Sequence, residues 1–249
     1  MSEILRLDAV SRHFSGLQAL RAVTLGVTQG EVLGLIGPNG AGKTTLVNTI
    51  CGVTPASSGR VTFMGQDITR IKTYQAARRG LSRTFQIVQP FAEFTALDNV
   101  AAAALFSQPG ESLKSAREKA RTHLAFVGLD AQAGQSAATL TLAMRKRLEL
   151  AKALAMKPKL LFLDEVNAGL NSAEVERATK LIHRLAADGI TIVMIEHLMK
   201  VVLNVCTRIA VLHNGLLIAD GPPRDVIRNP AVVDAYLGQR YAQRNAAGG

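Results

Sequence analysis

Residues 37–45 read Gly37-Pro38-Asn39-Gly40-Ala41-Gly42-Lys43-Thr44-Thr45, and this stretch decides the fold of the chain. It fits the pattern G-x-x-x-x-G-K-[ST], follows the apolar run Glu31–Ile36 and opens a helical pattern that ends near Cys51. A glycine-rich loop between a strand and a helix turns successive backbone N–H groups toward phosphate oxygens. The stretch therefore predicts a phosphate site; an ordinary glycine-rich turn is the alternative.

Two side chains of this stretch carry the expected chemistry. Lys43 would neutralise the β- and γ-phosphates of a nucleotide, and the Thr44 hydroxyl would ligate Mg²⁺. The whole run supplies the candidate nucleotide contacts: Gly37, Pro38, Asn39, Gly40, Ala41, Gly42, Lys43, Thr44 and Thr45.

A second motif places two acids at the end of a strand. The apolar run Leu160–Leu163 is followed directly by Asp164 and Glu165. Ligands of parallel sheets bind at the carboxyl ends of the strands. We therefore expect Asp164 on the Mg²⁺ side, through a water, and Glu165 as the general base that polarises the attacking water. A strand that ends in solvated acids is the alternative.

The order of strand and helix patterns indicates an α/β fold with a mostly parallel sheet. Strand and helix alternate in the first and last thirds, whereas residues 91–156 read as helical and resemble an inserted subdomain. We expect a P-loop ATPase core over about 1–90 and 157–220, and a C-terminal tail over about 221–249. Antiparallel strands are expected as well, including a hairpin around Asn214-Gly215, a dipeptide suited to a type I′ turn.

Composition excludes several classes of protein. Hydrophobic residues make up 48% and charged residues 19% of the chain, which is typical of a globular protein and not of a disordered one. Aromatic residues make up only 4%, with no Trp, which argues against a base-stacking RNA platform. Two Cys are too few for a disulfide framework. We find neither a signal peptide nor an apolar run long enough to span a membrane.

The net charge of +10 suggests phosphate, nucleic acid or an anionic membrane surface as a partner. The excess lies in two segments, residues 60–90 and residues 141–160, each with a net charge of +5. We expect these segments near the nucleotide, a dimer interface or the membrane-facing side, with part of the charge on a solvated helix face.

Further residues, in the order and spacing found here, resemble the nucleotide-binding subunit of ABC transporters over nearly the whole chain. They are Gln86 in Ser82-Arg83-Thr84-Phe85-Gln86, His197 after a strand, the run Ala168-Gly169-Leu170-Asn171, and Phe14. The resemblance implies that Gln86 contacts Mg²⁺ and the attacking water, that His197 reads the γ-phosphate, and that Phe14 stacks on adenine. Each residue alone also fits a plain structural role.

Within that family the chain is most similar to the LivG-like ATPases of branched-chain amino acid uptake systems. The tail carries part of this resemblance, with Gly221-Pro222-Pro223, Asn229-Pro230 and Asp234-Ala235-Tyr236-Leu237-Gly238. The resemblance implies an ATPase that uses ATP and Mg²⁺ and is coupled to import of hydrophobic amino acids. Solute specificity in such systems lies in other chains.

One segment departs from the family pattern. Where the signature LSGGQ is expected, the chain reads Leu140-Thr141-Leu142-Ala143-Met144. Thr141 keeps a hydroxyl and Ala143 keeps its N–H, so these two residues are the candidates that complete the ATP site of a partner subunit. The methyl group of Ala143 could block close approach there. We therefore expect a heterodimer of two different ATPases.

The expected assembly has further chains. Two membrane-spanning permease subunits and, indirectly, a periplasmic substrate-binding protein are implied, with this chain peripheral on the cytoplasmic face of the inner membrane. No nucleic acid partner is expected. The alternatives are a nucleotide-binding partner of low intrinsic ATPase activity and a soluble ABC ATPase that acts on nucleic acid.

Overall fold

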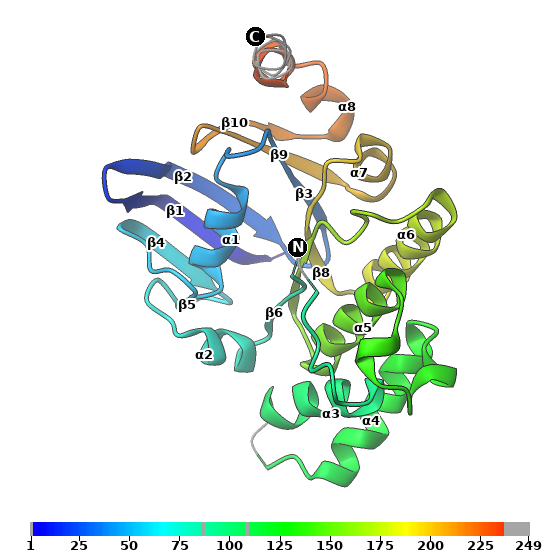
Figure 1. The fold of residues 1–249 in the computed structure, drawn as a ribbon. Coiled ribbons are helices and arrows are strands. Elements are labelled where there is room, and N and C mark those ends of the chain that lie inside the picture. The colour runs from blue at the N-terminus through cyan, green and yellow to red at the C-terminus, as the bar shows by residue number, and fades with distance from the viewer. Residues whose placement is uncertain (1, 86–87, 108–109, 237–249) are drawn as a thin grey trace. The chain divides into compact units, whose positions relative to one another are not determined.

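The computed structural model describes residues 2–85, 88–107 and 110–236, which form two units (Figure 1). The first unit contains the chain up to residue 72 and from residue 191 onward, and the second contains residues 73–190. Gln86 lies outside the described residues.

The first unit carries the phosphate loop between a buried strand and a helix. Its helices and strands are β1 (Glu3–Phe14), β2 (Leu17–Thr28), β3 (Val32–Ile36), α1 (Lys43–Ile50), β4 (Ser58–Phe63), β5 (Gln66–Asp67), β8 (Thr191–Ile195), α7 (Met199–Val205), β9 (Arg208–His213), β10 (Leu216–Gly221) and α8 (Pro223–Val226). In the antiparallel sheet the strands lie in the order β2-β1-β4-β5.

The other strands of this unit lie in the order β10-β9-β3-β8. The neighbours of β3 run parallel to it, and β10 pairs with β9 antiparallel. Every residue of β3 and of β8 is buried, as expected for strands covered on both faces. The turn between β9 and β10 has positive φ at Asn214 (48°) and Gly215 (78°), which confirms the expected type I′ turn.

The second unit is largely helical. It contains α2 (Thr73–Arg78), β6 (Leu81–Arg83), α3 (Ala96–Ser107), α4 (Leu113–Phe126), two short 3₁₀ helices (Asp130–Gln132 and Ala137–Thr139), α5 (Leu142–Ala155), β7 (Leu160–Asp164) and α6 (Ser172–Ala187). Strands β6 and β7 pair in parallel, and β7 is buried along its whole length.

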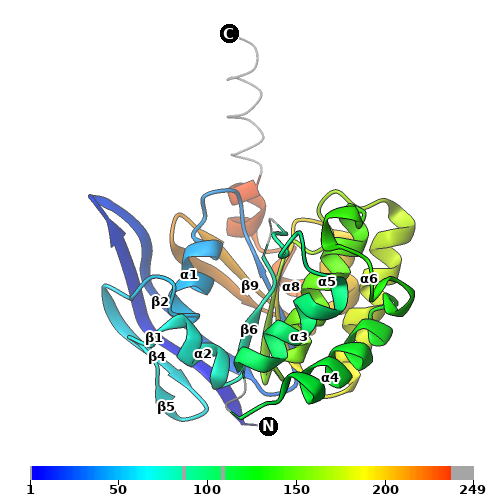
Figure 2. The same cartoon turned by 60° about the horizontal axis from the view of Figure 1, so that its bottom comes forward.

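Small side chains let three helices of the second unit approach closely. Helices α3, α4 and α5 pack on one another, and Figure 2 shows α3 and α4 side by side. Their buried residues include Ala101, Ala104, Ala116, Ala120 and Ala151. The alanine-rich pattern of residues 97–156 thus marks a helical bundle. The observed units do not set the boundaries of a functional subdomain, so the expected division at residues 90, 156 and 220 stays a prediction.

Candidate active site

The phosphate loop follows a path that only glycine permits. Gly37 has a φ of 147°, and a Cβ at this position would meet the Leu212 carbonyl oxygen at 2.1 Å. Gly42 has a φ of 105°, and a Cβ there would meet the Ala19 carbonyl oxygen at 2.7 Å. The loop therefore packs closely against the neighbouring backbone, which restricts it to one conformation.

The helix after this loop begins without a side-chain cap. Gly42 is the N-cap of α1, and it has no side chain that could accept from the N–H groups of the first turn. Those N–H groups, of Lys43, Thr44 and Thr45, have no acceptors within the helix. This end of α1 is suited to an anion.

Lys43 is folded back into the loop. Its Nζ donates to the Gly37 carbonyl oxygen at 2.6 Å and to the Pro38 carbonyl oxygen at 2.9 Å, and the residue is 6% exposed. The ammonium is thereby held among the backbone groups that would surround a phosphate. Phosphate oxygens are stronger hydrogen-bond acceptors than these two carbonyl oxygens.

Phe14 lies at the end of β1 and is 39% exposed, as a stacking platform for a base would need to be. The Arg12 guanidinium lies 4.4 Å from the centroid of this ring, and Arg12 Nη1 also donates to the Pro55 carbonyl oxygen. One face of the ring is therefore covered by a cation, a feature that the sequence analysis missed.

The end of β8 presents His197 on an exposed turn, and Glu196 shapes that turn. Glu196 is 3% exposed, and its Oε2 accepts from the backbone N–H of His197 at 3.1 Å and of Leu198 at 3.4 Å.

Burial and the charge of Glu196 raise the pKa of Cys206 to about 12. Cys51 and Cys206 are both buried.

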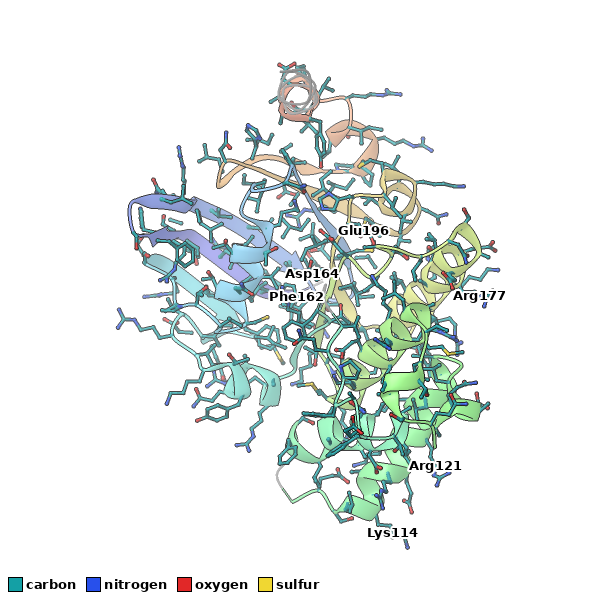
Figure 3. The ribbon with its side chains drawn as sticks, in the orientation of Figure 1. Lys114, Arg121, Phe162, Asp164, Arg177 and Glu196 are labelled. Carbon is teal, nitrogen blue, oxygen red and sulfur yellow. The ribbon has the colours of Figure 1, made fainter. Side chains whose placement is uncertain are left out.

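In the second unit, Asp164 ends β7 and is 3% exposed (Figure 3). Its Oδ2 lies 2.5 Å from Arg83 Nη2, and its backbone N–H donates to Thr84 Oγ1 at 3.1 Å. Glu165 follows with a φ of 48°, an unusual value for a residue with a Cβ. Such backbone strain is often found at functional sites.

The carbonyl of Glu165 accepts a hydrogen bond from the helix that precedes it in the chain, α5. Lys146 Nζ, on α5, donates to this oxygen at 2.9 Å, and the backbone N–H of Ala168 donates to it at 3.1 Å. The structure thus joins the helix after the signature position to the candidate base. Nothing in the sequence pattern links two residues 19 positions apart in this way.

At the signature position, Thr141 is the N-cap of α5. Its Oγ1 accepts from the backbone N–H of Met144 at 3.3 Å. Ala143 lies in the first turn of α5 and is not among the residues with positive φ. A glycine is therefore not needed there for backbone conformation, and only the added methyl group separates this residue from the family pattern.

Most cations of the basic segment 141–160 bind their own unit. Arg145 donates to the carbonyl oxygens of Leu140 and Ala138, and Arg147 donates to those of Val127 and Gly128. Lys152 pairs with the buried Glu149 at 2.5 Å. This segment therefore stabilises the fold of its unit, and its charge is weak support for a nucleic acid surface.

An exposed apolar patch lies on α3, α4 and the segment before α3. The aromatic patch consists of Phe91, Phe94, Phe106 and Leu113, which are 50–77% exposed. Residues of α3 and α4, with Phe94 of the segment before them, line a shallow pocket here, beside which Asp98 pairs with Arg117. Hydrogen bonding from Thr95, with a smaller contribution from Arg117, lowers the pKa of Asp98.

The donors expected for Mg²⁺ are the Thr44 hydroxyl, the Asp164 carboxylate and Gln86, which lies outside the described residues. Hard oxygen donors of this kind suit Mg²⁺. Among the described residues, no group of three or more His, Cys, Asp or Glu could hold a metal ion by itself. The Thr44 hydroxyl and the Asp164 carboxylate each suit a cation that brings phosphate oxygens of its own.

Comparison with known proteins agrees with this chemistry. Residues 20–168 match the family model described as ABC transporter, and residues 217–242 match the one described as branched-chain amino acid ATP-binding cassette transporter. The chain is 37% identical to the high-affinity branched-chain amino acid transport ATP-binding protein BraF of Pseudomonas aeruginosa, over 95% of this chain and 98% of that one. It is 35% identical to LivG of Escherichia coli, with the same coverage.

Solved structures give the same result for the fold. A nucleotide-free ATP-binding cassette from an ABC transporter superposes with a TM-score of 0.86 and 34% identity, over 94% of this chain and 99% of that one. A cassette in its ADP conformation matches equally well, over 96% and 100%. The expected fold class, a P-loop α/β core with antiparallel strands and a helical segment, is confirmed.

Proposed function

The chain belongs to the ABC transporter family, as one of its ATPases, and from this premise we propose that it powers an importer of branched-chain amino acids. The observation that carries the proposal is the glycine-only path of the phosphate loop at Gly37 and Gly42 with Lys43 folded into it. The solute class is supported by the similarity to BraF and LivG, which are branched-chain amino acid transport ATP-binding proteins, and by the match of residues 217–242.

The reaction is the hydrolysis of ATP to ADP and phosphate. Backbone N–H groups of residues 40–45 and the Lys43 ammonium bind the phosphates, and Phe14 stacks on adenine. Glu165 takes a proton from the water that attacks the γ-phosphorus, and the bond from the γ-phosphorus to the bridging oxygen breaks, so that this oxygen leaves with ADP. Gln86 contacts the attacking water, and His197 contacts the γ-phosphate. Thr44, Gln86 and, through a water, Asp164 would hold Mg²⁺, which would neutralise charge on the phosphate oxygens when bound.

Closure of two such ATPases on two ATP molecules would drive transport. The coupling energy is the stronger binding of ATP to the closed dimer than to the open one. Thr141 and Ala143 begin α5 and would contact the nucleotide held by the partner. Because Ala143 adds a methyl group to that contact, we favour a heterodimer. In it, the signature segment of the partner completes the ATP site of this chain.

The aromatic patch supports docking to a membrane subunit. Exposed apolar groups gathered on one surface mark interaction sites. None of the described helices is long and apolar enough to cross a bilayer. We place the chain on the cytoplasmic face of the inner membrane, bound to two permease subunits that receive solute from a periplasmic binding protein.

One observation favours a second candidate, a nucleotide-binding partner with low activity of its own. Leu142, Ala143 and Met144 replace the family pattern at the signature. If the chain formed a dimer with itself, both sites would use this segment. Brisk hydrolysis by the isolated chain, unchanged by Ala143→Gly, would argue against both this candidate and the heterodimer.

Reconstitution tests the transport function. The chain is combined with its permease subunits and partner ATPase in proteoliposomes, and uptake of labelled leucine is followed with ATP and the binding protein. We expect uptake with the wild-type chain and none with Lys43→Ala. ATP-dependent uptake that persists in Lys43→Ala, or hydrolysis that no branched-chain amino acid stimulates, would overturn the assignment.

A further inference from the structure

Arg83 and Asp164 form a buried ion pair within the second unit. Arg83 Nη2 lies 2.5 Å from Asp164 Oδ2, and the two side chains are only 10% and 3% exposed. Exposed pairs of this kind contribute little because solvent screens them. A buried carboxylate, in contrast, depends strongly on a compensating cation.

The backbone fixes this pair in place. Arg83 ends β6 and is in register with Phe162 of the parallel strand β7, two residues before Asp164. Thr84 then donates its N–H to the Phe162 carbonyl oxygen at 2.9 Å, and its Oγ1 accepts from the Asp164 N–H. The strand ladder thus fixes the backbone of both partners, and the long Arg83 side chain reaches from β6 to the carboxylate.

We propose that Arg83 is a positioning residue that occupies the Asp164 carboxylate when no divalent cation is there and yields it when Mg²⁺ binds with ATP. This proposal rests on the proposed role of Asp164 in holding Mg²⁺. A carboxylate oxygen that a guanidinium contacts at 2.5 Å is less available to water or metal, and two cations on one carboxylate repel each other. Arg83 and Mg²⁺ therefore compete.

The structure offers the displaced guanidinium a second partner. The guanidinium carbon of Arg83 lies 5.3 Å from the centroid of the Phe85 ring, and this ring is 54% exposed. A cation over an aromatic ring is stabilised by the ring quadrupole. The guanidinium can therefore leave Asp164 and remain over Phe85. Binding of a cation at Asp164 then changes the contacts of Arg83, which belongs to the segment that precedes Gln86.

Competition predicts that removal of Arg83 strengthens Mg²⁺ binding. In Arg83→Met, which keeps the aliphatic length of the side chain, the carboxylate lacks its resident cation. We expect the Mg²⁺ concentration that half-saturates binding of a fluorescent ATP analogue to fall by about fivefold or more. Arg83→Lys keeps a charge without the planar fork and should give a smaller fall. The matched control is Arg79→Met, because Arg79 is exposed, and it should keep the wild-type value.

Two readouts separate this role from a purely structural one. The first is binding of Mn²⁺ in the presence of ATP, followed by electron paramagnetic resonance, which should tighten in Arg83→Met. The second is the rise in melting temperature on changing from ATP with EDTA to ATP with Mg²⁺, which should be larger in the variant than in the wild type. This readout remains usable if the variant is destabilised.

Unchanged or weakened Mg²⁺ dependence in folded Arg83→Met would overturn the competition. If Arg83→Met does not fold, the same result in Arg83→Lys overturns it. If the wild-type chain bound no nucleotide, either with EDTA or with Mg²⁺, the proposed function itself would be refuted. The two failures are therefore distinguishable.

Discussion

Lys146 Nζ donates to the carbonyl oxygen of Glu165 at 2.9 Å, which links the signature helix to the residue proposed as the general base. Glu165 has a positive φ of 48°, so its backbone needs support from its surroundings. The contact offers a physical route by which the start of α5, where a partner's nucleotide would bind, can affect the hydrolytic residue of the same chain.

We predict that Lys146→Met lowers kcat by about ten- to a hundredfold and leaves the affinity for ATP unchanged, because a small displacement of a catalytic group is costly. Steady-state phosphate release and equilibrium binding of a fluorescent nucleotide measure the two quantities. Lys180→Met is the control, since Lys180 makes an exposed pair with Glu176 on α6. Equal losses of kcat in both variants would contradict this link.

Gly37→Ala should abolish nucleotide binding and lower the free energy of unfolding by about 3 kcal/mol or more. The new Cβ would meet the Leu212 carbonyl oxygen at 2.1 Å, which the backbone can relieve only by moving. Gly40→Ala is the matched control, because its φ is also positive but nothing lies within 4 Å. We expect it to cost about 1–2 kcal/mol from strain alone. Urea unfolding compares the two, and equal costs would refute the close contact.

Asn99→Ala should destabilise the segment that carries the aromatic patch. Asn99 is fully buried on α3, its Oδ1 accepts from the Phe91 N–H at 2.9 Å, and its Nδ2 donates to the carbonyl oxygens of Phe91 and Thr95. Loss of these bonds should cost roughly 2–4 kcal/mol of unfolding free energy.

Hydrogen exchange should show faster opening of residues 91–95 in Asn99→Ala. Gln135→Ala, at an exposed position of the same unit, should stay near wild type in both measurements. Unaltered exchange in this segment would mean that Asn99 does not hold it.

Acidification should weaken the second unit through His123. Burial, with a smaller contribution from the charge of Lys157, lowers the pKa of His123 below its usual 6.5. The unfolded chain therefore takes up a proton below pH 6.5 before the folded chain does, and stability falls as the pH drops through that window.

His123→Gln should flatten the dependence of stability on pH between about 7 and 5, measured by urea unfolding at each pH. Asp98 does not confound the test, because its folded pKa lies below the usual 3.8 and its stabilisation is lost only at lower pH. The same slope with and without His123 would exclude this residue as the cause.

Periodicity and turn chemistry predicted much of the fold. Helix α6 (Ser172–Ala187) and strand β8 (Thr191–Ile195) begin and end where their patterns do, because a capping box at Asn171 and full burial give clear signals. Helices α2 and α7 were not predicted, since they are short and their stability comes from packing. The apolar and polar residues of 81–85 predict a strand as far as Phe85, but β6 ends at Arg83, and the Phe85 ring is exposed.

In the candidate site, too, some features could be predicted from the sequence and others could not. The places of the loop around Lys43 and of the acids Asp164 and Glu165 at strand ends could be predicted, because their motifs are local in sequence, and their roles stay predictions. The supporting contacts of Arg83, Lys146 and Glu196 could not be assigned from the sequence, because two of them join residues 19 and 81 positions apart. Glu196 acts through backbone N–H groups that no pattern marks.

The most direct test of the central claim, that Glu165 is the base of an ATPase, is phosphate release by Glu165→Gln in the assembled complex. We predict that turnover falls to background while the complex retains labelled ATP, because the glutamine keeps the shape of the side chain and loses its ability to take a proton. Phosphate release near the wild-type rate would contradict the account.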